Sequence, residues 1–191
     1  MRFIFEQIIQ IVYNMKMFKL MSVMSMMLMV CTASAQTRND KKLILDATKA
    51  KKTLLKTDSS LEKFFDESAG HVIFPNVGKG GFIIGGASGN GVVYEEGKAI
   101  GMANLKKLNI GLQAGGQAII EVIFFETSID LDRFKEGEFQ FAAEASAVAL
   151  KSGIAFNAKY KDGVAVFALP KAGLMADASV GGQKFSYDPF E

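Results

Sequence analysis

The sequence predicts an α+β fold in which N-terminal helices pack on a strongly curved, mainly antiparallel β-sheet or barrel. Two amphipathic segments at the front of the domain carry apolar residues at helical spacing. The chain behind them is divided into short runs of β-branched and aromatic residues, separated by turn-forming glycines. Many short strands joined by small turns favour a curved antiparallel sheet with the helices at its front end.

The first helix is predicted over residues 40–57, with Asp40 as its cap. Its buried side is an apolar stripe at helical spacing, made of Leu43, Ala47, Ala50 and Leu54 and widened by Ile44 and Leu55. The opposite side carries Lys41, Lys42, Lys49, Lys52 and Lys56. Lys51 falls beside the stripe and has to extend its ammonium sideways to water. A second helix is predicted over residues 59–67, where Ser59 and Glu62 form a capping-box pattern.

Residues 71–94, HVIFPNVGKGGFIIGGASGNGVVY, form the clearest strand-forming region. The pattern predicts a strand, a turn at Pro75-Asn76, and a hairpin whose arms, 82–87 and 91–95, meet at residues 88–90. Two later segments, IGLQAGGQ and ASVGGQK, repeat its small-residue pattern and share Gly-Gly-Gln. We expect all three segments to lie in one sheet.

Further elements are predicted downstream from the same signals. Residues 108–127 are the most hydrophobic stretch and are expected to bend or divide at Gly115-Gly116. A short helix is expected over residues 129–135. The remaining strands are predicted at 99–104, 139–150, 154–160, 164–169 and 174–187, with turns at 95–98, 161–163 and 170–171. The alanine-rich segment 139–150 could instead be partly helical.

Residues 1–35 are predicted to be a leader with a secretory signal peptide, and residues 36–191 a single domain. Lys16 and Lys19 precede a core of Met, Leu and Val, and Ala33-Ser34-Ala35 supplies a signal-peptidase site. We therefore expect cleavage after Ala35. Translation from Met15 or Met17 would omit the first residues, which fit no export signal well.

The leader predicts an exported protein, periplasmic or extracellular, that is soluble or peripheral on a membrane. No later segment has the roughly 18 uninterrupted apolar residues of a spanning helix. Lipidation of Cys31 is not favoured, because such sites normally have Ala, Gly or Ser where this chain has Val30. Cleavage after Ala35 leaves no cysteine for disulfides or thiol chemistry.

The charge pattern excludes a whole-domain field for nucleic acid. Outside the leader, basic and acidic residues are equal in number, although the chain as a whole has 22 of the former and 20 of the latter. Residues 36–56 are the exception, with seven basic residues against Asp40 and Asp46. The lysines of this helix could attract anionic headgroups while its aliphatic side enters the membrane interface. An ordinary surface helix with solvated lysines fits the pattern equally well.

No catalytic or metal-binding constellation is present in the sequence, and no cofactor or metal is expected. His71 is the only histidine and lies at the start of a predicted strand, which favours a structural role. Ser88 lies in Gly-Ala-Ser-Gly-Asn, which lacks the last glycine of a nucleophile elbow, and a turn role is predicted. The carboxylates of Glu121, Glu144 and Asp177 are expected on a solvent-facing side of strands. The chain is therefore predicted not to be an enzyme.

Several long blocks resemble the SYLF domain family of lipid-binding proteins, in its bacterial exported branch. They are GHVIFPNVGKGGFIIGGASGNGVVYEEGKAIG, GLQAGGQ, FAAEASAVAL and DGVAVFALPKAGLMADASVGGQKFSY. The resemblance covers nearly all of residues 50–187. It implies a lipid-binding module, linked to phosphoinositides and actin in eukaryotic members, with an N-terminal amphipathic helix contributing to membrane contact.

Together these observations predict a non-enzymatic exported domain that contacts anionic phospholipid or a membrane surface through Lys41, Lys42, Lys49, Lys52 and Lys56. The chain departs from the family pattern at residues 101–105, GMANL, and contains no tryptophan. Actin is not an expected partner in an exported compartment. The alternative is a periplasmic structural or stress-related module that binds a protein and no lipid.

Overall fold

The computed structural model describes residues 15, 17–19, 21, 39–137, 140–141 and 148–190. Contacts divide the chain into two units, Met1–Lys41 and Lys42–Glu191, and the account below concerns the second. The predicted cleavage site after Ala35, and Cys31, lie outside the described residues. Among the described residues, no helix is both long enough and apolar enough to span a membrane.

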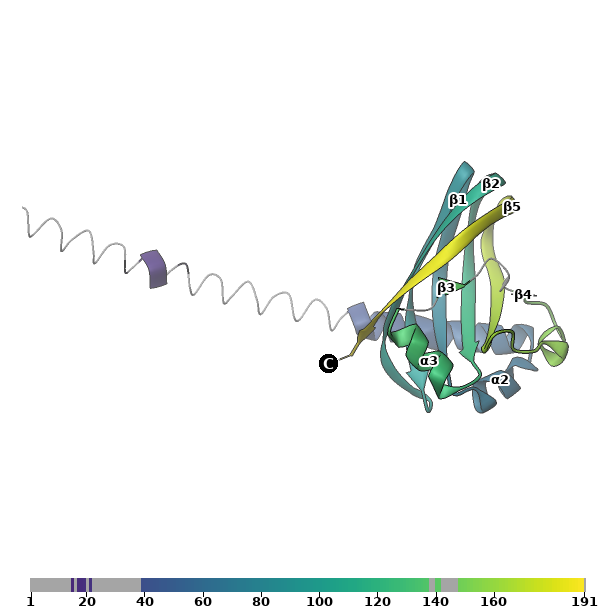
Figure 1. The fold of residues 1–191 in the computed structure, drawn as a ribbon, viewed down its shortest axis with the longest axis horizontal. Helices are drawn as coiled ribbons and strands as arrows, with labels where there is room; N and C mark the ends of the chain where they lie inside the picture. The colour runs from purple at the N-terminus through teal and green to yellow at the C-terminus, as the bar shows by residue number, and fades with distance from the viewer. Residues whose placement is uncertain are drawn as a thin grey trace, which may run out of the picture. The chain divides into compact units, whose positions relative to one another are not determined.

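Three strands of unusual length build the sheet (Figure 1). They are β1 (Gly70–Glu95), β2 (Lys98–Phe125) and β5 (Val164–Pro189), with 26, 28 and 26 residues. β2 lies between the other two and pairs antiparallel with both. β3 (Gln140–Phe141) pairs antiparallel with β5, and β4 (Val148–Ala149) pairs parallel with it. The predicted α+β class is confirmed, with a mixed, mainly antiparallel sheet whose described pairings follow an open path rather than a closed barrel.

β1 turns back on itself, and glycine makes this possible. A Cβ atom at Gly91 would lie 2.9 Å from the carbonyl oxygen of Ile73 and 2.7 Å from the ring of Phe74. A Cβ atom at Gly89 would lie 2.9 Å from the carbonyl oxygen of Asn76. The early and late parts of one strand are therefore in contact at positions that have no side chain.

Three predicted turns lie inside strands, and these predictions were wrong. Pro75-Asn76 and residues 88–90 belong to β1, and residues 170–171 belong to β5. Both prolines sit beside register shifts, one between Phe74 and Val77 and the other next to the pair of Ile119 with Pro170. Proline has no N–H and cannot donate a hydrogen bond to the neighbouring strand. A bulge leaves one residue of the strand unpaired, so a proline is tolerated there. The turn predicted at 95–98 is confirmed by positive φ angles at Glu96 and Gly97.

The other strand predictions have mixed outcomes. β2 runs through Gly115-Gly116 without dividing, and β5 joins the two predicted strands 164–169 and 174–187. Residues 154–160 are not a strand but contain the 3₁₀ helix η1 (Ala155–Asn157). Within 139–150 the described residues form β3 and β4, and the residues between these strands lie outside the described chain.

The predicted helices are present. The first spans residues 39–57, followed by α2 (Leu61–Glu67), and α3 (Ser128–Lys135) follows β2. The capping box expected at Ser59 is absent, because the N-cap of α2 is Ser60 and makes no side-chain cap bond. A capping box occurs instead at α3, where the side chains of Thr127 and Asp130 bond to each other's backbone N–H groups.

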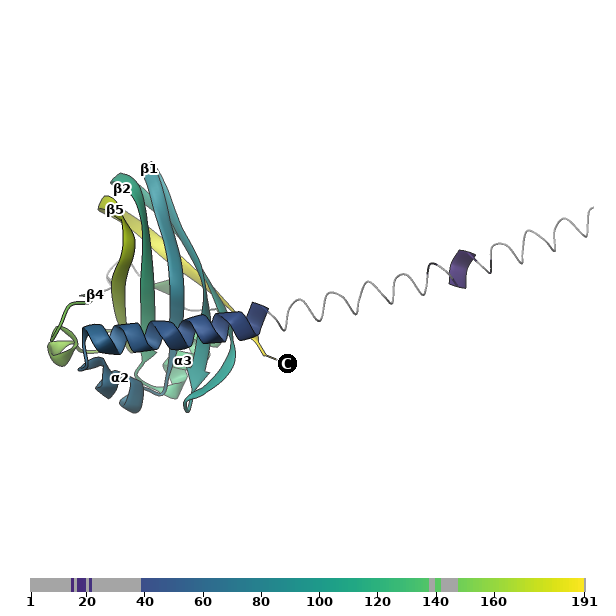
Figure 2. The same cartoon turned by 180° about the vertical axis from the view of Figure 1, so that it is seen from behind.

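The alternating side chains of the long strands build two hydrophobic clusters. The N-terminal cluster joins helix 39–57 and α2 to the sheet, and Figure 2 shows this helix crossing the strands. Its buried members are Ala47, Ala50, Leu54, Leu61, Phe64, Ile73, Val92, Ile120, Val122, Phe124, Leu150, Ala155, Ala165 and Phe167. The α3 cluster uses the intervening strand residues, such as Val72 and Val93, together with Leu131 and Phe134 of α3. The predicted stripe of the first helix is therefore buried against the sheet.

Candidate functional site

The predicted lipid-binding lysines Lys41, Lys42, Lys49, Lys52 and Lys56 are all exposed. Four of them, Lys42, Lys49, Lys52 and Lys56, lie in the unit Lys42–Glu191 and are called the lysine face below. The Nζ atom of Lys49 lies 3.6 Å from the carboxylate of Asp46, but the lysine side chain remains 77% exposed. Such a surface pair is weak and screened by salt. The lysine face thus keeps its charge available to a partner.

A leucine interrupts the lysine face. Leu45 is 61% exposed and falls between the lysines, because residues three or four apart share one side of a helix. The opposite side of the helix is occupied, since Ala47, Ala50 and Leu54 are buried in the N-terminal cluster. The expectation that the aliphatic side enters a membrane is therefore corrected: in this fold the sheet covers it, and the large apolar groups left facing outward are Leu45 and the lysine stems.

Lys51 does not simply extend into water as expected. Its Nζ atom lies 4.2 Å from the centre of the Phe65 ring, a cation–π contact. This places a fixed positive charge beside His71, whose imidazole packs edge-on against Phe65 and stacks on Tyr94 with ring centres 5.0 Å apart. Lys51 is consequently a structural lysine and not part of the lysine face.

His71 is 5% exposed and belongs to this aromatic packing, in agreement with the predicted structural role. Burial, and after it the charge of Lys51, lowers the pKa of His71 from 6.5 to about 3. The imidazole is therefore neutral at physiological pH. The imidazole packs against the aromatic rings of Phe65, Tyr94 and Phe124.

The predicted carboxylate positions have different outcomes. Glu121 is 1% exposed, so its expected solvent-facing position was wrong. Its neighbours across the sheet are Phe74 on β1 and Ala168 on β5, which place it towards the α3 side. Glu144 and the side chain of Asp177 lie outside the described residues. Within the described part of the chain, no three His, Cys, Asp or Glu residues are grouped as a metal site would require.

Asp58 connects the end of the first helix to η1. Its carboxylate accepts hydrogen bonds from the backbone N–H and hydroxyl of Ser60, and from the backbone N–H of Ala155 at 2.9 Å. Burial raises the pKa of Asp58, but hydrogen bonds from the Ser60 side chain and from the backbone of Ala155, Ser60 and Gly153 outweigh it. The net pKa lies below the usual 3.8, and the carboxylate is charged at neutral pH.

Replacing Asp58 with asparagine should lower the unfolding free energy by about 2 kcal/mol, because charge-assisted hydrogen bonds to a buried carboxylate are lost. A lowered folded pKa means that this stabilisation is present above 3.8 and disappears as pH falls through the folded value. Urea unfolding at neutral pH and in acid measures both effects. The exposed Asp66→Asn is the matched control, and equal losses in the two variants would contradict the role of Asp58.

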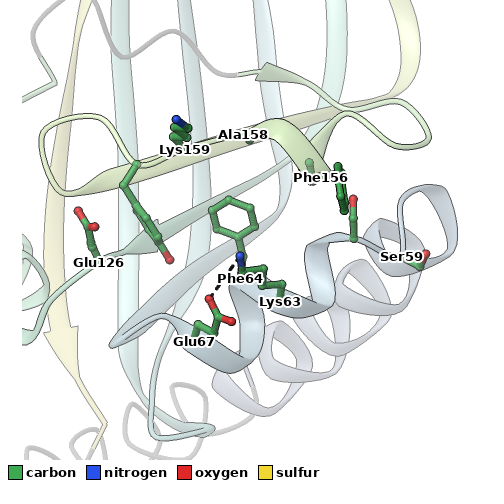
Figure 3. A pocket seen from close by; sticks show the side chains of 11 residues that line it. Ser59, Lys63, Phe64, Glu67, Glu126, Phe156, Ala158 and Lys159 are labelled. Carbon is green, nitrogen blue, oxygen red and sulfur yellow. Dashed lines mark ion pairs between the residues drawn. The ribbon is translucent and has the colours of Figure 1, made fainter.

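A pocket of about 760 Å³ opens beside this connection (Figure 3). It lies between α2, η1 and the start of the segment leading into β5, and is lined by Ser59, Ser60, Lys63, Phe64, Glu67, Glu126, Ala155, Phe156, Ala158, Lys159 and Tyr160. Its charges are mixed: Lys63 and Glu67 are 3.9 Å apart. Burial, with the carboxylates of Glu126 and Glu67, raises the pKa of Tyr160 to about 12. Among the described residues, no hydrogen-bond partner reaches the buried hydroxyl of Tyr160.

The sequence did not reveal this pocket. Residues 154–160 were predicted as a strand, which would have placed Phe156 and Tyr160 on the sheet. The available signal was Ser152-Gly153, a turn-forming pair directly before the segment, and Gly153 indeed has a φ of 77°.

Comparison with known proteins gives one informative similarity. The chain is 28% identical over 137 residues to Beta cell expansion factor A of Aeromonas veronii. The aligned region covers 71% of this chain and 52% of that protein, so the chain spans about half the length of its relative. No family model matches the chain. The resemblance to SYLF domains thus stays a prediction from the sequence.

Proposed function

We propose that this protein is a non-enzymatic, exported lipid-binding domain that contacts anionic phospholipid through the lysine face. The observation that carries the proposal is the exposure of Lys42, Lys49, Lys52 and Lys56 on a helix whose other side is fixed to the sheet. Each lysine near an anionic membrane surface contributes about 1 kcal/mol of attraction. Together, four such residues are sufficient for measurable binding. The SYLF resemblance supports the same function.

The packing of the helix specifies how contact is made. Since Ala47, Ala50 and Leu54 stabilise the N-terminal cluster, the helix binds while docked on the sheet and does not turn its stripe towards lipid. The lysines engage headgroups, and Leu45 is the one large apolar side chain between them. Binding is then mainly electrostatic and falls steeply as salt rises.

Vesicle flotation tests the proposal with the chain beginning at Gln36, the predicted mature N-terminus. Replacing all four residues of the lysine face with glutamine is expected to weaken binding to anionic vesicles by about 100-fold or more, given ~1 kcal/mol for each charge. Neutral vesicles should bind neither form.

The matched control replaces four exposed lysines elsewhere, Lys98, Lys106, Lys171 and Lys184, with glutamine. The control variant has the same net charge as the lysine-face variant. If the lysine face has a specific role, the control variant should bind anionic vesicles more tightly than the lysine-face variant does. Removing the helix is unsuitable, because truncation before Ser59 would uncover the N-terminal cluster. Absence of vesicle binding, with capture of one stoichiometric protein, would favour the alternative interaction module. Peptide mapping of the exported protein tests the cleavage after Ala35.

A further inference from the structure

A short segment with exposed apolar side chains follows β4. Phe156 is 80% exposed and Ile154 is 37% exposed, both in or next to η1. Residues 151–161, KSGIAFNAKYK, contain three lysines and no carboxylate. Apolar side chains flanked by lysines are the composition of segments that lie in a membrane interface. A single exposed phenylalanine is common on protein surfaces and does not by itself indicate a binding site. Its position in the fold is therefore the evidence needed.

That position is set by two contacts with the end of helix 39–57. The backbone N–H of Asp58 bonds to the carbonyl of Leu54 at 2.9 Å, and the Asp58 carboxylate accepts the N–H of Ala155 at 2.9 Å. Ala155 itself is 2% exposed and packs in the N-terminal cluster. Phe156, the next residue, is thereby held beside the helix end that carries Lys56. Figures 1 and 2 both show the segment between β4 and β5 next to this end of the helix.

We propose that Ile154 and Phe156 form a second membrane contact, which inserts into the interface of an anionic bilayer while the lysine face holds headgroups. This inference rests on the proposed function. The partner is a bilayer surface because Lys151 and Lys159 flank the apolar residues in the sequence, and the segment lies next to the helix end that carries Lys56 (Figures 1 and 2), a charge pattern complementary to anionic headgroups. The pocket behind Phe156 has mixed charge and does not supply that pattern.

The absence of tryptophan from the chain allows a direct test. Phe156→Trp in the full chain places a single fluorophore at the proposed tip, and Ile129→Trp places one at a matched position. Ile129 is 70% exposed on α3, which packs in the other hydrophobic cluster. Vesicles of phosphatidylglycerol and phosphatidylcholine are expected to shift the emission of the first variant to shorter wavelength, and brominated lipid to quench it. The second variant should show neither change.

A binding measurement provides the second readout. Phe156→Ser is expected to weaken vesicle binding by about 10-fold, the effect of leaving one aromatic side chain out of an apolar phase. Ile129→Ser should bind as the unaltered chain does.

The two proposals can fail separately. Vesicle binding that depends on the lysine face, with no emission shift at position 156, would overturn the second contact and keep the proposed function. A tryptophan at 156 already blue-shifted without vesicles lies in the pocket, and this too would overturn it. Absence of binding to anionic vesicles would overturn both.

Discussion

Replacing Gly91 with valine is expected to lower the unfolding free energy by about 3 kcal/mol or more, a large fraction of the stability of an ordinary domain. The added Cβ would lie 2.9 Å from the carbonyl oxygen of Ile73 and 2.7 Å from the Phe74 ring. A ring can rotate away, but the carbonyl belongs to the backbone of β1. The two parts of the strand would have to separate, opening the α3 cluster in which Phe74 is buried. Urea unfolding measures the loss.

Gly78 supplies the control for this prediction, because it lies in the same strand and a Cβ atom there meets nothing within 4 Å. Gly78→Ala is expected to be neutral or to stabilise by about 0.5 kcal/mol, through reduced freedom of the unfolded chain. Gly91→Ala should already be destabilising. Equal stability of the two alanine variants would mean that the close approach between Gly91 and Ile73 is absent in solution.

The second large effect is acid sensitivity caused by His71. Its pKa is about 3 in the folded protein and 6.5 as the ordinary value. Between these values the unfolded chain binds a proton that the folded protein does not, so stability rises with pH through this window. Well inside the window the slope approaches about 1.4 kcal/mol per pH unit, and it flattens above 6.5. His71→Phe is expected to remove this slope.

The comparison isolates His71, because the carboxylates titrate in both proteins and cancel in the difference between the two stability curves. Lys51→Gln provides a further control. Since burial is the larger cause of the low pKa, removing the lysine charge should raise the folded pKa only in part. His71 is the only histidine, so its imidazole resonances in an NMR titration need no assignment. Titration near 6.5 in the folded protein would refute the buried, neutral form.

Helical spacing was enough to predict the first helix and its orientation. Ala47, Ala50 and Leu54 are buried as their period requires, and the lysines are exposed. The sequence could not show that the apolar stripe is buried against the sheet, because an amphipathic helix has the same pattern whether its apolar side packs on a sheet or on a membrane. That distinction depends on long-range contacts with residues such as Ile120 and Phe167.

The turns were harder to predict for a related reason. Gly89, Gly91 and Pro75 have the composition of turns, yet they lie inside one continuous strand. Local propensity does not distinguish a glycine that allows the chain to reverse from one that allows another part of the chain to approach. The pocket was missed because its residues come from three separate segments. Asp58 and Ala155, which bring two of these together, are far apart in the chain and share no motif.

The length of the strands has a consequence for the order of folding. β1 and β2 can pair outward from the turn between them, beginning with Glu95 and Lys98. β5 has no such start, because even the partners nearest in sequence, Phe125 and Val164, are separated by α3, β3, β4 and η1, and at the other end Gly101 pairs with Pro189. Contacts between residues so distant in sequence form slowly. Until they form, the full length of β2 is an unpaired edge, which can recruit strands of other molecules. The pairing of β5 with β2 therefore determines how long each molecule is at risk of aggregation.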